Sequence, residues 1–161
     1  MNVAIVVFSE TGKTLKLAEL AREKLLADRH SVQLTRLQTD PVFDSKHNLP
    51  EDQIKFTNLP DLGSASVLIF GTPVWAFRPC AAGRKALRDL GPQLKGKSVL
   101  PFITHGFPWA WLTGTSSASA LRRLAADFGA KALAGVVLSG SMKKGEDRYQ
   151  AAAEKIRNLL K

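Results

Sequence analysis

The chain has 161 residues, of which 45% are apolar, and a formal net charge of +9. This length suits a single domain, residues 1–161, with a sizeable core. No apolar run approaches the ~20 residues of a membrane span, and no basic-then-apolar leader precedes the first apolar stretch, so we expect no membrane insertion and no secretory signal. The single cysteine, Cys80, excludes an intramolecular disulfide and suits a reducing cytoplasm.

The chain opens with an apolar, β-branched stretch from Val3 to Phe8, which is typical of a buried strand. Residues 15–27 carry apolar side chains at helical spacing. Between strand and helix lies a hydroxyl-rich turn, Ser9-Glu10-Thr11-Gly12-Lys13-Thr14. Backbone N–H groups at a helix start attract anions, and three hydroxyl groups add further donors. The turn therefore predicts a phosphate site, with an ordinary capped helix start as the alternative.

Two phosphate-binding patterns compete for this turn. The end of a Walker A loop fits Gly12-Lys13-Thr14, but that pattern needs a glycine where Val7 stands. The strand that ends at Phe70 also lacks a magnesium-binding aspartate at its tip. The pattern [ST]-x-T-G-x-T is filled at every fixed position, and it resembles the phosphate loop of the flavodoxins, which bind flavin mononucleotide (FMN). Many members have Asn where Lys13 stands, so two roles of Lys13 stay open: it either pairs with the phosphate or faces solvent.

Further apolar segments predict the remaining strands, separated by helical patterns. We expect strands at residues 31–37, 66–70, 98–104 and 130–139, the first of them at an edge. We expect helices over 79–90, over 118–128 with Thr115, Ser116 or Ser117 as cap, and from 146 onward. Residues 39–64 are expected to be mostly loop, with a short helix starting at Pro50.

Strands that alternate with helices predict a doubly wound parallel sheet covered on both faces, an α/β fold. Right-handed crossovers and the order 2-1-3-4-5 for five strands place the carboxyl ends of strands 1, 3 and 4 around one crevice, where ligands bind. Unusual sequences stand at these three tips: the phosphate turn, Gly71-Thr72-Pro73-Val74-Trp75 and Thr104-His105-Gly106-Phe107.

The order and spacing of these tips resemble the flavodoxin-like family over nearly the whole chain, and the uninterrupted last strand resembles its short-chain members. The resemblance implies FMN, with its phosphate held by residues 9–14. It implies that Trp75 stacks on the flavin ring and that backbone groups of Thr72, Pro73 and Val74 edge the ring. Gly106 would let the third loop approach the ring without a Cβ.

Several residues at the tips have open roles. His105 is either a protonated imidazole beside the flavin or a loop histidine bonded to backbone. Phe107 forms an aromatic cluster with Trp109 and Trp111, which either is local core, covers the ring, receives a planar substrate or makes a subunit contact. Ala76 stands where small flavodoxins have a glycine, and we expect it to resist positive φ, which weakens the expectation of one-electron carrier behaviour.

Residues for covalent or metal chemistry are not evident. The three histidines are far apart in sequence, so we expect no metal site, and catalytic residues stay unassigned. Cys80 follows Pro79 at a helix start and is either a buried small residue or a thiol with a lowered pKa.

We therefore expect an FMN-dependent electron-transfer protein. The alternatives are an NAD(P)H-dependent quinone or FMN reductase and a flavodoxin-fold binding protein without flavin. Residues 81–161 carry the whole +9, which departs from the usual acidity of flavodoxins and indicates either solvated helix faces or a docking face for an acidic redox partner. A small planar substrate such as a quinone is the other expected partner. Nucleic acid is not expected, because the basic residues are scattered, and the chain is expected as a monomer or homodimer.

Overall fold

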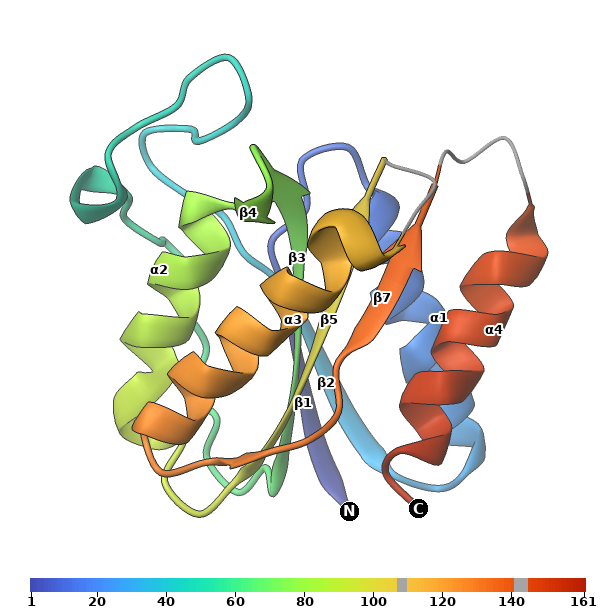
Figure 1. Ribbon diagram of the computed structural model, residues 1–161. Helices are drawn as coiled ribbons and strands as arrows, with labels where there is room; N and C mark the ends of the chain where they lie inside the picture. Colours follow the sequence, from blue (N-terminus) through green and yellow to red (C-terminus); the bar gives the residue numbers. More distant parts are fainter. Residues whose placement is uncertain (107–109, 141–144) are drawn as a thin grey trace.

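The structure, a computed structural model, describes residues 1–106, 110–140 and 145–161, although it leaves the side chains of residues 110–113 undescribed. Parallel strands form its central sheet: β1 (Asn2–Val7), β2 (Ser31–Arg36), β3 (Val67–Trp75), β5 (Ser98–His105), β6 (Lys131–Ala132) and β7 (Val136–Ser139). Their order is β2-β1-β3-β5-β6, with β7 also beside β5, and β4 (Arg78–Pro79) pairs antiparallel with the end of β3. Figure 1 shows this twisted sheet between helices.

Helices cover both faces of the sheet (Figure 1). On one face lie α1 (Lys13–Ala27) and α4 (Glu146–Asn158), whose buried side chains share a core cluster with Val3, Ile5 and Val7 of β1. On the other face lie α2 (Ala81–Leu90) and α3 (Ala110–Asp127), whose buried side chains share a second cluster with Ala4, Val6 and Phe8. The alternation along β1 follows from the two-residue period of a strand.

Short 3-10 helices complete the fold at η1 (Glu51–Gln53) and η2 (Gly91–Gln93). The first confirms the short helix expected after Pro50, which is its N-cap. None of the helices in the described ranges is long and apolar enough to cross a membrane. The two-sided α/β sheet and the expected relative order of its strands are therefore confirmed, with differences in three segments.

The first difference is that β3 and β5 run further than expected. Residues 71–73, expected as loop, pair with residues 102–104 of β5, and Val74 and Trp75 pair with β4. The second is that the expected strand over 130–139 is divided into β6 and β7. Gly135 lies between them, and a Cβ there would approach the Cβ of Ala118 to 2.7 Å, so α3 crosses the chain closely at this point.

The third difference concerns the start of α3. The helix begins at Ala110, so the expected cap at Thr115, Ser116 or Ser117 is wrong. The first half of α3 contains several small residues and shows no apolar periodicity in the sequence. Small side chains allow the helix to lie close to the sheet. A Cβ on Gly114 would lie 2.4 Å from Val137 of β7, so the helix rests directly on the sheet there.

Candidate functional site

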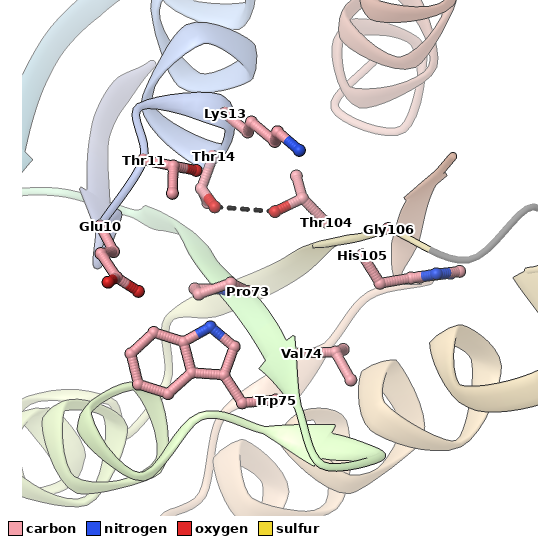
Figure 2. Close-up of a pocket in the computed structure, with 10 residues that line it drawn as sticks. All are labelled: Glu10, Thr11, Lys13, Thr14, Pro73, Val74, Trp75, Thr104, His105 and Gly106. Carbon is pink, nitrogen blue, oxygen red and sulfur yellow. Dashed lines mark hydrogen bonds between the residues drawn. The ribbon is translucent and has the colours of Figure 1, made fainter. Parts of the chain in front are cut away.

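A cavity of about 190 Å³ opens at the carboxyl ends of β1, β3 and β5. Three chain segments line it, contributing Glu10, Thr11, Lys13, Thr14, Pro73, Val74, Trp75, Thr104, His105 and Gly106. Figure 2 shows the phosphate turn and Trp75 on opposite sides of this pocket, with Pro73 between them and Thr104 beside Thr14. The expected crevice at the three strand tips is therefore present, and most of the expected residues meet in it.

The phosphate turn lies between β1 and the first turn of α1. Gly12 is the N-cap of α1 and has a φ of 85°, a left-handed conformation that glycine adopts without strain. The hydroxyl of Ser9 accepts a hydrogen bond from the backbone N–H of Leu15 at 3.2 Å, so it satisfies a donor of the helix start. Among the hydrogen bonds of the described residues, none uses the backbone N–H groups of residues 11–14. These donors at a helix N-terminus form a site for an anion.

Thr14 connects the turn to the end of β5. Its Oγ1 lies 2.8 Å from Oγ1 of Thr104, and both residues are buried (Figure 2). One hydroxyl of this pair donates to the other, so the accepting hydroxyl keeps its own hydrogen for a further partner. The pair therefore adds a hydroxyl donor to the backbone N–H donors of the anion site.

Lys13 also lines the pocket and brings a positive charge to it. None of the ion pairs between the described side chains includes Lys13. In Figure 2 its ammonium group lies on the Thr104 side of the turn. Whether Lys13 pairs with a phosphate or faces solvent stays a prediction.

On the opposite side of the pocket Trp75 packs against Phe8 and Phe43, and these three rings form an aromatic wall of which only Trp75 lines the pocket. Trp75 stacks on Phe43 with ring centroids 5.4 Å apart and an interplanar angle of 20°, and Phe8 meets the indole edge-on at 6.1 Å. Phe43 therefore covers one face of the indole, and a further planar ring that stacks on Trp75 must take the other face. Phe43 was missed from the sequence, because it lies in the connection of residues 39–64, which has no periodic pattern.

The same connection is tied to the phosphate turn through Glu10. One carboxylate oxygen of Glu10 accepts hydrogen bonds from the backbone N–H of Ser45 at 3.2 Å and from its hydroxyl at 2.7 Å. Arg36, at the end of β2, donates to the backbone carbonyl of Ser9 at 2.8 Å. Glu10 thus supports the turn from the side, a role that the sequence pattern does not reveal.

Four expected site residues do not line the cavity. Ser9 and Gly12 act within the turn, as described above. Thr72 is buried and its hydroxyl lies 3.1 Å from the sulfur of Cys80, on the side of the sheet covered by α2. Ala76 lies in the turn between β3 and β4. Phe107 and Trp109 lie outside the described residues, so their expected roles stay predictions.

The turn between β3 and β4 overturns one expectation. Ala76 has a φ of 46° and Phe77 a φ of 65°, so both adopt the left-handed conformation that Ala76 was expected to resist. Two consecutive residues of positive φ form the tight turn that suits a two-residue hairpin, and the pairs Val74–Pro79 and Trp75–Arg78 hold it. Strain of this kind persists where the surrounding structure enforces it.

His105 is buried beside α3, at the end of β5. A Cβ on Gly114 of α3 would lie 2.9 Å from the imidazole Nε2, and Figure 2 shows the ring directed away from the phosphate turn. Burial lowers the pKa of His105, because it disfavours the charged imidazolium. Near neutral pH the imidazole is therefore uncharged, which weakens the proposal of a protonated partner for a flavin.

Cys80 is the N-cap of α2. Its sulfur accepts a hydrogen bond from the backbone N–H of Gly83 at 3.4 Å and lies against the hydroxyl of Thr72. Burial raises the pKa of the thiol to about 11, so of the two readings of Cys80 the structure supports the buried one. No group of three metal-ligating side chains occurs within the described part of the chain.

No protein-family model matches the chain, and no curated protein matches it. Solved structures do match. Flavodoxin 2 from Bacillus cereus has a TM-score of 0.71 and 16% identity, with 99% of this chain and 98% of that chain covered. The flavodoxin of Megasphaera elsdenii has a TM-score of 0.64 and 23% identity, with coverage of 94% and 98%. The apo form of an NADH:FMN oxidoreductase has a TM-score of 0.70 and 21% identity, with coverage of 99% and 88%.

These similarities extend over almost the whole chain, at identities that show the fold and not the activity. The chain therefore has the flavodoxin-like fold.

Proposed function

We propose that the chain binds FMN in the pocket between the phosphate turn and Trp75 and serves as an electron-transfer flavoprotein. The observation that carries this proposal is the group of backbone N–H donors of residues 11–14, which the described hydrogen bonds leave unused. Four N–H groups, the hydroxyl pair of Thr14 and Thr104 and the cation of Lys13 offer hydrogen-bond donors and one positive charge to a phosphate, while the carboxylate of Glu10 in the same pocket is engaged by Ser45.

The other side of the pocket suits the flavin ring. Trp75 has one face against Phe43 and still lines the cavity, so its second face is available to a flat aromatic system. Pro73 and Val74 would edge the ring, and Gly106 would leave room for it, because a Cβ there meets no atom within 4 Å. FMN bound in this way would accept and donate electrons, while these residues orient it and exclude water from one side.

A titration of the purified protein with FMN tests this proposal. Binding quenches flavin fluorescence, and we expect a one-to-one complex that binds FMN at least tenfold more tightly than riboflavin, which lacks the phosphate. A protein that takes up neither flavin overturns the proposal and favours the binding protein without flavin.

The second candidate function is an NAD(P)H-dependent flavin or quinone reductase. The specific observation in its favour is the similarity to an NADH:FMN oxidoreductase over 99% of this chain. Direct bleaching of the FMN-loaded protein by NADH or NADPH, without a partner reductase, supports this candidate. A long-lived one-electron reduced form during dithionite titration, with no reaction with NADH or NADPH, supports the electron carrier.

The partner of a carrier is expected to be acidic. Arg78 pairs with Trp75 in the hairpin of β3 and β4, and none of the ion pairs between the described side chains includes it, so its cation is available to an acidic partner beside the pocket. The single buried thiol of Cys80 is consistent with a reducing cytoplasm as the place of action.

A further inference from the structure

One ring of the aromatic wall comes from a segment that does not line the flavin pocket. Phe43 is 3% exposed, stacks on Trp75 and does not line the flavin pocket. It belongs to the long connection between β2 and β3, and it also contacts Phe8 with ring centroids 5.7 Å apart. Its ring therefore fixes the plane of the indole from behind.

Two residues further along, the same segment contacts the phosphate turn. Ser45 donates two hydrogen bonds to Glu10, and the carboxylate of Asp44 accepts the backbone N–H groups of Lys46 and His47 at 2.9 and 2.7 Å. Phe43 is also anchored at its backbone N–H, which donates to the hydroxyl of Thr39 at 2.9 Å. Residues 43–47 thus contact both Trp75 and the phosphate turn, and hydrogen bonds fix their backbone.

We infer that Phe43 is a positioning residue for flavin binding: its ring fixes the indole of Trp75 so that one face receives the flavin, and the bond from Ser45 to Glu10 sets the spacing between this ring and the phosphate turn. This inference rests on the proposed function. Without Phe43 behind it the indole can take other orientations, so the binding of a ring stacked on Trp75 is expected to weaken by about threefold to tenfold.

The test compares two Phe→Leu variants. F43L removes the ring behind Trp75. F56L is the matched control, since Phe56 lies in the same connection, packs against the same core cluster and makes none of the ring contacts found among the described residues. F43Y keeps the ring and serves as the conservative rescue. Urea unfolding of each variant establishes that it is folded before flavins are added.

The readouts separate positioning from simple loss of stability. We expect F43L to weaken FMN and riboflavin binding by the same factor, about threefold to tenfold, because the ring end is affected in both ligands. The visible-region circular dichroism of bound FMN, which reports the geometry of the ring against its neighbours, should change in F43L and stay unchanged in F56L and F43Y. The effects of S45A and F43L on FMN affinity should not be additive in the double variant.

Two outcomes contradict the inference while the proposed function stands: equal effects of F43L and F56L on affinity and dichroism, or additive effects of F43L and S45A. Failure of the wild-type protein to bind either flavin overturns the proposed function, and the inference with it. The wild-type titration therefore distinguishes the two failures.

Discussion

The phosphate end and the ring end of the pocket differ in how many segments of the chain form them. The phosphate end is one contiguous turn, residues 9–14, between a buried strand and a helix. The ring end is assembled from three distant segments, with Phe8 after β1, Phe43 in the long connection and Trp75 at the end of β3. The first depends on local backbone geometry, and the second on tertiary packing.

This difference determines how each end responds to mutation. A change in the turn alters donors that already lie at a helix start, so it should change affinity for the phosphate and little else. A change in the aromatic wall or its supports moves a packed cluster, so it should change stability together with the ring site. The predictions below test this separation, beginning with the largest effect.

The largest effect is expected from Gly12→Val at the phosphate end. Gly12 has a φ of 85°, and a β-branched side chain cannot keep this conformation without strain of about 1–2 kcal/mol. The backbone would then turn its N–H groups away from the anion site. We expect FMN affinity to fall about 100-fold and riboflavin affinity to change less than threefold, measured by fluorescence titration.

Gly96→Val provides the control for this variant. Gly96 has a φ of 78°, and like Gly12 it has no atom within 4 Å of an added Cβ, so the strain is matched. It precedes β5, at the end of the sheet away from the pocket. An equal loss of FMN affinity in both variants would show that the effect of Gly12 comes from destabilisation and not from the anion site.

The same comparison explains what could be predicted from the sequence. The phosphate turn was identified because its signal is local in the sequence: a glycine and hydroxyl residues stand between a strand and a helix. Trp75 was identified because it follows a strand tip. Phe43 was not, since its role comes from a contact with Trp75 across 32 positions of sequence, and no periodicity marks its segment.

The backbone conformation of Ala76 and the burial of His105 could also not be predicted from the local sequence. Intrinsic preference argued against positive φ at Ala76, but the pairing of β3 with β4 decides its conformation. His105 stands at a strand tip, and its burial depends on tertiary contacts such as the close approach of Gly114 in α3. In both cases tertiary contacts override the local signal.

The next effect in size concerns the support of the ring end. Cys80→Ala removes the sulfur that accepts from Gly83 and contacts Thr72, which directly precedes Pro73 of the pocket. Loss of an N-cap and of a buried hydrogen-bond partner should lower the free energy of unfolding by about 1–2 kcal/mol. Cys80→Ser keeps an acceptor at the cap and should lose less than half as much. If both variants lose the same amount in urea unfolding, the sulfur does not act as a cap.

A smaller effect, with the opposite sign, is expected from Ala76→Gly in the hairpin turn. Glycine relieves the left-handed strain at this position, so the variant should be more stable by about 1 kcal/mol, seen as a higher urea midpoint at an unchanged m value. Arg29→Gly is the control, because Arg29 has a φ of 63° just after α1, away from the pocket. A gain in Arg29→Gly without a gain in Ala76→Gly would mean that the hairpin turn carries no strain of its own.

The smallest expected effect is the pH dependence of stability that His105 contributes. Burial lowers the pKa of His105 below its ordinary value of 6.5, so between these two pH values the unfolded chain binds more protons than the folded one. The free energy of unfolding should therefore fall as the pH decreases through 6.5 and level off below the lowered pKa.

His105→Gln should remove this slope, because the amide does not titrate. Urea unfolding of both proteins in steps from about pH 7.5 to 5 measures the difference. If the variant keeps the full slope of the wild type, another group causes it. If addition of FMN to the wild type flattens or reverses this slope, the bound cofactor raises the pKa of the imidazole, and the electrostatic role of His105 toward the flavin regains support.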